Sequence, residues 1–258
     1  MESKNHIKSL EKCFNILDLL STAHSPLKLE EITRKSQYKK TTCFRLLKTM
    51  IGLGYVEQNP VDKTYRFGNR LVSLGLSALK DMSLRRNALP VLEKLRDETG
   101  ETVNLSILSG TEILFVERIM SDYLVNVNVN IGDRLPVHCA SMGKVILAFS
   151  PKKKADEIIS RLLFESKTDC TITSISSFKK ELKEIKKKGF ALNDEELEKG
   201  LRAVAAPIFN YTDEAFAAIN IAWTTTRKPG REYFAEFAPK IVTAAEKIST
   251  LMGYRRHP

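Results

Sequence analysis

The sequence predicts an α+β protein of two parts, and three observations lead to that prediction. Apolar residues recur at helical spacing up to residue 53, and two short alternating segments follow. From residue 102 the apolar period changes to two, with helical segments interspersed. Neighbouring strands joined by short turns favour a largely antiparallel sheet flanked by helices. The 258 residues, 43% of them hydrophobic, suffice for one large or two ordinary domains.

Three helices are expected at the amino end, over residues 9–23, 29–35 and 40–53. Each carries an apolar stripe at helical spacing, as a helix does when one side is buried. A short turn at 36–38 separates the second helix from the third. This order is typical of a helix-turn-helix motif.

Two strands follow these helices, at 55–57 and 64–67, and form a hairpin that we interpret as a wing. Residues 1–68 are therefore predicted to be a winged helix-turn-helix domain. A linker helix is expected over 69–82, and a second domain over 83–258.

The second domain is expected to begin with a helix, bent or restarted at Pro90, and to continue with three successive strands. Gly110 and Thr111 predict a two-residue turn between the first two strands. The expected helices lie at 84–100, 141–149, from 151, 176–188 and 231–252, and the expected strands at 102–110, 111–119, 123–131, 190–193, 202–209 and 215–223.

The chain is basic, with a net charge of +10. Residues 1–70 hold 13 Lys and Arg against 7 Asp and Glu, so the surplus is densest around the helix-turn-helix motif. Such a balance suits an anionic partner such as nucleic acid, although solubility alone would also explain it.

The third helix begins with basic and hydroxyl residues, and in this motif that end enters the DNA major groove. Thr41 and Thr42 can donate to phosphate, while Arg45 can reach the O6/N7 edge of guanine or a phosphate. A solvated basic helix face is the alternative. Phe44 either packs beneath the helix or lies against a thymine methyl group, and we expect packing. The residues predicted to contact double-stranded operator DNA are Lys39, Lys40, Thr41, Thr42, Arg45, Lys48, Lys63, Tyr65 and Arg66.

Four blocks of the sequence resemble, in order, the IclR family of bacterial transcriptional regulators. They are SLEKCFNILDLL, TTCFRLLKTMIGLGYVEQ, GDRLPVHCASMGKVILA and GFALNDEELEKGLRAVAAPIFN with the following AAINIA. The resemblance implies a winged helix-turn-helix joined by a helix to a GAF- or PAS-like effector domain. It also implies homodimers, often paired into homotetramers, on partly palindromic operators.

The resemblance further implies a pocket for a small organic acid. A helix start binds a carboxylate well, and Ser141 and Met142 match the family's positions whose backbone amides meet the ligand. The side chains differ from those of the glyoxylate- and pyruvate-sensing relative, and block 132–148 is more similar to relatives that sense aromatic acids or β-ketoadipate-pathway intermediates. The predicted effector contacts are Arg134, His138, Ser141, Met142, Asn193, Ala203, Asn220 and Ala222.

Simpler interpretations remain open for several polar residues. Arg134 could be a surface cation, His138 a packed histidine donating to the backbone, and Lys144 a helix-face lysine. The acidic cluster at 194–198 could hold a metal or a general acid, but we expect a solvated loop or a helix amino end.

Two other classes of protein compete with a ligand-responsive regulator. An enzyme acting on a small carboxylic acid would use His138, Cys139 and Asp194, yet chain neighbours such as His138 and Cys139 are poorly placed as a nucleophile–base pair. The sequence contains no phosphate loop, GxSxG or HExxH motif. A structural nucleoid protein would need no second domain. We therefore expect a regulator rather than an enzyme.

The chain offers no apolar run of the ~20 residues that cross a bilayer and no signal-peptide core, so a cytoplasmic protein without membrane contact is expected. The four cysteines are scattered and expected to be free thiols. The four histidines do not cluster with them as zinc ligands would, so neither metal nor cofactor is expected.

Overall fold

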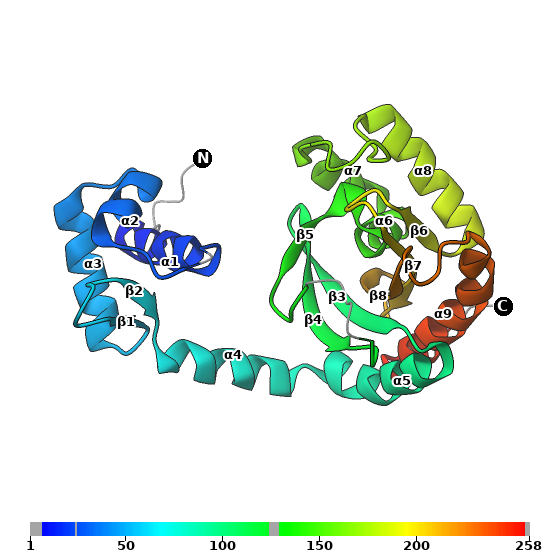
Figure 1. Cartoon of the computed structure of the whole chain (residues 1–258), viewed down its shortest axis with the longest axis horizontal. Coiled ribbons are helices and arrows are strands. Elements are labelled where there is room, and N and C mark those ends of the chain that lie inside the picture. The colour runs from blue at the N-terminus through cyan, green and yellow to red at the C-terminus, as the bar shows by residue number, and fades with distance from the viewer. Residues whose placement is uncertain (1–6, 24, 124–128, 256–258) are drawn as a thin grey trace. The chain divides into compact units, whose positions relative to one another are not determined.

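A computed structural model of the chain describes residues 7–23, 25–123 and 129–255. These residues form two compact units, which divide between Asp81 and Met82 (Figure 1). The first unit contains α1 (Lys8–Ser21), α2 (Leu29–Ser36), α3 (Lys40–Gly52), β1 (Val56–Gln58), β2 (Tyr65–Phe67) and α4 (Asn69–Asp81).

The helix-turn-helix is set by local signals at the ends of α2. The carboxylate of Glu31 accepts a hydrogen bond from the Lys28 N–H at 2.8 Å and so satisfies a free donor at the helix start. Gln37 adopts a left-handed conformation with φ of 58°, which ends α2 and turns the chain into α3. Ile16, Ile32 and Leu47 bring the three helices together in one core. The predicted winged helix-turn-helix is thus confirmed.

The wing is an antiparallel pair in which Val56 lies opposite Phe67. Gly68, which follows β2, lies against the residues that follow α3. An added Cβ at Gly68 would lie 2.3 Å from the carbonyl oxygen of Gly54. Only glycine allows this close approach, so Gly68 determines how closely the wing packs against the end of α3.

The second unit is built around a six-stranded antiparallel sheet in the order β5-β4-β3-β8-β7-β6 (Figure 1). Its strands are β3 (Thr102–Ser109), β4 (Glu112–Ile119), β5 (Arg134–Pro136), β6 (Ala191–Asp194), β7 (Leu201–Phe209) and β8 (Ala215–Thr224). Its helices are α5 (Ser83–Thr99), the 3-10 turn η1 (Val137–Cys139), α6 (Ser141–Ala148), α7 (Lys152–Arg161), α8 (Ile175–Lys188) and α9 (Glu232–Leu251).

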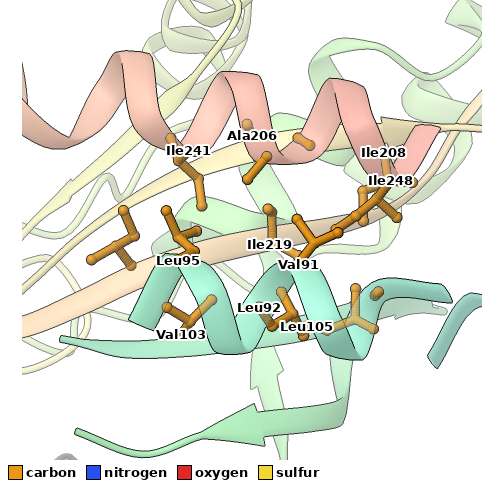
Figure 2. Packing of buried hydrophobic residues seen from close by; sticks show 14 of the residues in the cluster. Val91, Leu92, Leu95, Val103, Leu105, Ala206, Ile208, Ile219, Ile241 and Ile248 are labelled. Carbon is orange, nitrogen blue, oxygen red and sulfur yellow. The ribbon is translucent and has the colours of Figure 1, made fainter. Parts of the chain in front are cut away.

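The two faces of this sheet have different partners. Apolar side chains of β3, β7 and β8 meet α5 and α9 on one face, as Figure 2 shows. The other face packs against α6, α7 and α8. Because successive strand residues point to opposite faces, Ile219 and Ile221 belong to the first core, whereas Ala218 and Asn220 point toward α6.

The α+β class and the antiparallel sheet are as predicted, but three details differ. Residues 124–128 of the predicted strand 123–131 lie outside the described residues, and its described ends are not in a strand. The strand that pairs with β4 is instead Arg134–Pro136. Pro90 does not restart the helix but lies within α5. Within the described residues, no helix has the length and apolar character required to cross a membrane.

Candidate functional site

The exposed face of α3 gathers residues at positions 41, 44, 45 and 48, which follow one another along one side of a helix. Thr41, Phe44, Arg45 and Lys48 are all solvent-exposed, while Cys43, Leu47 and Met50 form the buried face. The expectation that Phe44 packs beneath the helix is therefore wrong, because half of its surface (50%) is exposed. Phe44 lies instead on the outer face, one helical turn after Thr41.

The other residues predicted to contact DNA differ in their exposure and in whether they form an ion pair. Lys39 is exposed, Thr42 is half-buried, and Lys40 forms a 2.7 Å ion pair with Glu30. In the wing, Lys63 is exposed and Arg66 forms a 3.1 Å ion pair with Glu57.

Tyr65 does not belong to this exposed set. Its residue surface is only 3% exposed, and it is part of the core of the first unit. Its backbone N–H donates to the carbonyl of Leu27 at 2.8 Å, which ties the wing to the loop before α2. The prediction of a DNA contact through the Tyr65 side chain is wrong, because alternation along β2 turns this side chain inward while Arg66 points outward.

A cavity lies in the second unit between the sheet and the amino end of α6. The space between its walls, including the open mouth, is about 420 Å³. Most of the lining is apolar, and the polar groups come from a few residues on the sheet and on α6. The lining residues are Asn104, Ile113, Phe115, Arg118, Val129, Leu135, Ala140, Ser141, Met142, Asn193, Leu197, Leu201, Ala203, Asn220 and Ala222.

The wall formed by α6 presents the start of a helix. The first i to i−4 hydrogen bond of α6 runs from Lys144 N to Ala140 O at 3.0 Å. The N–H groups of residues 141–143 come before it and have no acceptor within the helix. The Ser141 hydroxyl is buried and has no hydrogen-bond partner among the described residues. Gly143 lets the helix approach η1, since a Cβ there would lie 2.7 Å from the Cα of Val137. This wall therefore offers donors and a partial positive charge to an anion.

The wall formed by the sheet carries a polar row across three strands. Arg118 of β4 lies opposite Asn104 of β3, which in turn lies opposite Asn220 of β8. The Asn104 Nδ2 donates to Asn220 Oδ1 at 2.8 Å. In the next row, the small side chains of Ala203 and Ala222 lie opposite each other and leave room above the sheet.

Arg118 and Asn104 were not among the residues predicted from the sequence. Burial lowers the pKa of the Arg118 guanidinium, and the nearby Asp133 carboxylate opposes this shift. An arginine starts from so high a pKa that it keeps its charge at neutral pH. The cavity thus contains a partly buried cation, Arg118. The alternation of residues along β4 was insufficient to identify it from the sequence.

Asn193 lines the cavity, but both polar groups of its side chain already form hydrogen bonds within the protein. Its Nδ2 donates to Cys139 O at 2.9 Å, and its Oδ1 accepts from Glu196 N at 3.0 Å. The first bond ties the end of β6 to the segment before α6, and the second fixes the loop after β6. Asn193 therefore shapes the cavity chiefly by fixing its walls.

Two predicted effector contacts do not lie in the cavity. The guanidinium of Arg134 is exposed and donates to Ser109 Oγ at 2.8 Å, as expected of a surface cation. The imidazole of His138 is buried, with its Nε2 2.9 Å from Glu165 O and its ring against Phe164. The prediction of cavity contacts is wrong for both, because β5 directs Arg134 to the surface and η1 buries His138 away from the lining.

The acidic cluster is not a helix amino end, and of its four carboxylates only Glu198 is exposed as a solvated loop would be. Asp194 and Glu195 pair with Arg202 at 2.7 and 3.3 Å. Glu196 pairs with Lys144, whose side chain is fully buried (0% exposed) and lies 3.7 Å from Glu181. Lys144 is therefore an internal cation rather than a helix-face lysine, and the ion pairs hold the loop after β6 against α6.

The residues required by the enzyme hypothesis are engaged in structural contacts. Asp194 pairs with Arg202 and Arg231. Burial raises the pKa of the Cys139 thiol to about 11, with the Glu196 carboxylate adding to the shift, so the thiol is neutral at pH 7 and a poor nucleophile. No group of three or more His, Cys, Asp or Glu residues in the described part of the chain could hold a metal ion.

Comparison with known proteins places both units in one family. Residues 9–60 match the IclR helix-turn-helix domain, and residues 76–250 match the bacterial transcriptional regulator IclR C-terminal domain. The chain belongs to the IclR family of transcriptional regulators. Members of the IclR family combine a helix-turn-helix with a C-terminal effector-binding domain, and this chain contains both.

Individual IclR relatives match over nearly the whole chain. The HTH-type transcriptional regulator XynR of Escherichia coli is 32% identical over 96% of this chain and 98% of its own length. KdgR of the same organism is 31% identical over 98% and 95%. A solved structure of a putative regulator from Rhodococcus, RHA06195, is 30% identical with a TM-score of 0.79, over 96% of this chain and 99% of that one. These relatives support the family and the fold, and they leave the effector open.

Proposed function

We propose that this IclR-family chain binds operator DNA through α3 and the wing and that a small organic acid in the cavity modulates this binding. The observation that carries the proposal is a cavity whose buried Ser141 hydroxyl and α6 amino end offer donors, in the same chain as an exposed helix-turn-helix face. The first feature suits an anionic ligand, and the second suits DNA.

On the DNA side, Arg45 is the base-reading residue and Phe44 lies against a thymine methyl group. Both side chains are exposed on the face of α3 that also carries Thr41 and Lys48, which supports this assignment. The residues proposed to contact phosphates are Lys39, Lys40, Thr41, Thr42, Lys48, Lys63 and Arg66.

On the effector side, the carboxylate of the acid lies at the amino end of α6, near Ser141 and Met142. Arg118 adds a positive charge to the same cavity. Phe115, Leu135 and Met142 provide apolar wall against which a ring packs, and this supports an aromatic acid as the finer proposal. Asn104, Asn193, Ala203, Asn220 and Ala222 complete the proposed site.

The acid controls DNA binding only through its different affinity for two arrangements of the protein. The buried Lys144–Glu196 pair ties α6 to the loop after β6, so an acid at the start of α6 acts on a packed element rather than on a free loop. Homodimers or homotetramers provide the two DNA-binding units that partly palindromic operators require.

The proposal is tested by measuring thermal stability with a panel of aromatic and aliphatic acids and by repeating the measurement with DNA enriched from a random pool. We expect at least one acid to raise the melting temperature and to change DNA affinity, without being consumed. Stabilisation without any effect on DNA would contradict the coupling. Turnover of the acid would favour the enzyme hypothesis, and no stabilisation by any acid would exclude the sensor.

A further inference from the structure

The asparagine pair in the polar row is buried within the effector cavity. Asn104 and Asn220 are 4% and 7% exposed, and both line the cavity. They lie directly opposite each other on β3 and β8, 116 residues apart in the chain. Polar side chains buried in this way are normally fully hydrogen-bonded, so any group without a partner points to a missing contact.

The pair uses only part of its hydrogen-bonding capacity. Each amide has one carbonyl acceptor and two N–H donors. Asn104 Nδ2 donates to Asn220 Oδ1, and Asn104 Oδ1 is buried without a hydrogen bond from any described residue. Exchanging oxygen and nitrogen in both side chains would only move the unused carbonyl to Asn220. In either orientation the pair keeps one unused acceptor and an amide donor within the wall of the cavity.

A carboxylate cannot complete this pair, because it accepts hydrogen bonds and does not donate them. An apolar group would leave both the acceptor and the donor unsatisfied. A hydroxyl group donates to the free carbonyl and accepts from the amide at once. The neutral pair therefore suits a hydroxyl, whereas the amino end of α6 and the Arg118 guanidinium suit the carboxylate.

We infer that Asn104 and Asn220 select a hydroxy acid, that is, an acid with a hydroxyl group remote from its carboxylate. The inference rests on the proposed function, since it assumes that the cavity holds the effector. The asparagine pair would distinguish acids with a hydroxyl group from acids without one, which an apolar wall cannot do. A site built to bind a hydroxyl rejects the analogue that lacks it, because its buried polar groups then lose their partner.

The test compares matched acids by isothermal titration calorimetry on the full chain: 4-hydroxybenzoate with benzoate, and 6-hydroxyhexanoate with hexanoate. In at least one pair, the hydroxy acid should bind roughly tenfold or more tightly than its partner. In the double variant Asn104→Leu/Asn220→Leu, the ratio of the two affinities should fall toward one, because the hydroxyl group has lost both of its hydrogen-bond partners. Asn87→Leu, which changes a half-buried asparagine outside the cavity, should leave the preference intact.

The outcomes separate the two proposals. Equal binding within both pairs, or tighter binding of the plain acids, would overturn hydroxyl selection while leaving the acid sensor in place. Binding of no acid at all would overturn the sensor as well. A preference that survives in the double variant would remove the asparagines from the explanation. If the double variant does not fold, the comparison within the wild-type chain decides alone.

Discussion

At the residue scale, exposure distinguishes the side chains that α3 presents from those that build it. Arg45 is exposed and one turn from the helix start, which is the position from which an arginine reaches a base edge. Tyr65 has a polar group and lies in the wing, but it is buried. A polar side chain in the right motif is therefore insufficient for a DNA contact, because the strand alternation decides its direction.

Arg45→Ala should weaken binding to the enriched DNA by about 1–3 kcal/mol and relax base preference at one position, because a bidentate contact is lost. Fluorescence anisotropy on matched and mismatched duplexes measures both effects. Arg161→Ala, which removes an exposed arginine from α7, serves as the control and should change neither. Unaltered affinity and selectivity in Arg45→Ala would exclude base reading by Arg45.

Lys144 is a second case in which the residue type does not predict where the side chain lies, because this charged side chain is buried. Its ammonium group is fully buried and pairs with Glu196, while Glu181 lies 3.7 Å away. Burial raises the pKa of Glu196, whereas Lys144 lowers it, and the net direction is upward. Removing one partner of such a pair leaves the other charge buried and uncompensated.

Lys144→Met should lower the free energy of unfolding by ~3–5 kcal/mol near neutral pH. The loss should shrink as the pH falls through the raised pKa of Glu196 toward its ordinary value of 4.5, because the folded protein then holds Glu196 protonated. Urea unfolding at about pH 7.5 and about pH 5 measures this difference.

Two variants control this measurement. Lys144→Met/Glu196→Leu should recover most of the stability, because no buried charge remains in the pair. Lys179→Met removes an exposed 2.7 Å pair with Asp156 and should cost at most about 1 kcal/mol. A loss in Lys144→Met that is the same at both pH values would contradict the role given to Glu196.

At the element scale, the close approach of α6 to η1 depends on Gly143. An added Cβ would lie 2.7 Å from the Cα and 2.9 Å from the carbonyl oxygen of Val137, so the backbone would have to move. The same helix end forms one wall of the cavity. Its position therefore links the stability of the second unit to the shape of the site.

Gly143→Ala should destabilise the protein by about 1–3 kcal/mol and weaken binding of any acid that the wild type binds. Gly75→Ala provides the contrast, because it lies in the exposed α4 with no atom within 4 Å of the added Cβ. That change should stabilise by ~0.5–1 kcal/mol through helix propensity. Thermal unfolding followed by circular dichroism compares them, and equal effects of the two variants would argue against the steric account.

Elements with a clear period could be predicted from the sequence, whereas contacts between distant strands could not. The two-residue turn between β3 and β4 was evident from alternation interrupted at Gly110. The polar row was not, because the register of β4, β3 and β8 brings Arg118, Asn104 and Asn220 together. The short β5 escaped prediction because three residues carry no period.

The residues predicted to contact the effector divide in the same way, into those that line the cavity and those that do not. Ser141, Met142, Asn220 and the two alanines line the cavity, as the resemblance implied. Arg134 and His138 do not, because a motif gives position along the chain but not the direction of a side chain. The Lys144–Glu196 pair joins residues 52 positions apart, and neither local sequence reveals the other.

At the scale of the whole molecule, the first unit leaves an apolar surface without a partner among its described residues. No residue of α4 is buried, and Val72, Leu74 and Leu76 are exposed. Phe14, Leu17, Phe67, Leu71 and Val72 line a groove between α1, β2 and α4. An exposed apolar surface of this kind suits the association of subunits.

Phe14→Lys/Val72→Lys should reduce the mass of the protein in solution, or shift its association to higher concentration, because charges replace apolar contacts in the groove. The affinity for palindromic DNA should fall with it, since two linked units bind more tightly than one. Light scattering and anisotropy measure the two effects. Ser73→Lys adds a charge to the adjacent exposed position of α4 and should change neither. An unchanged mass and affinity in the double variant would rule out this surface as an interface.

The alternation along β8 has a consequence for how such a protein diverges. Ile219 and Ile221 secure the core with α9, while Asn220 and Ala222, their immediate neighbours, line the cavity. Point substitutions at the second pair can retune chemical preference without disturbing the scaffold formed by the first. If the cavity holds the effector as proposed, a lineage can change effector through single substitutions within one strand, without altering the fold or the helix-turn-helix.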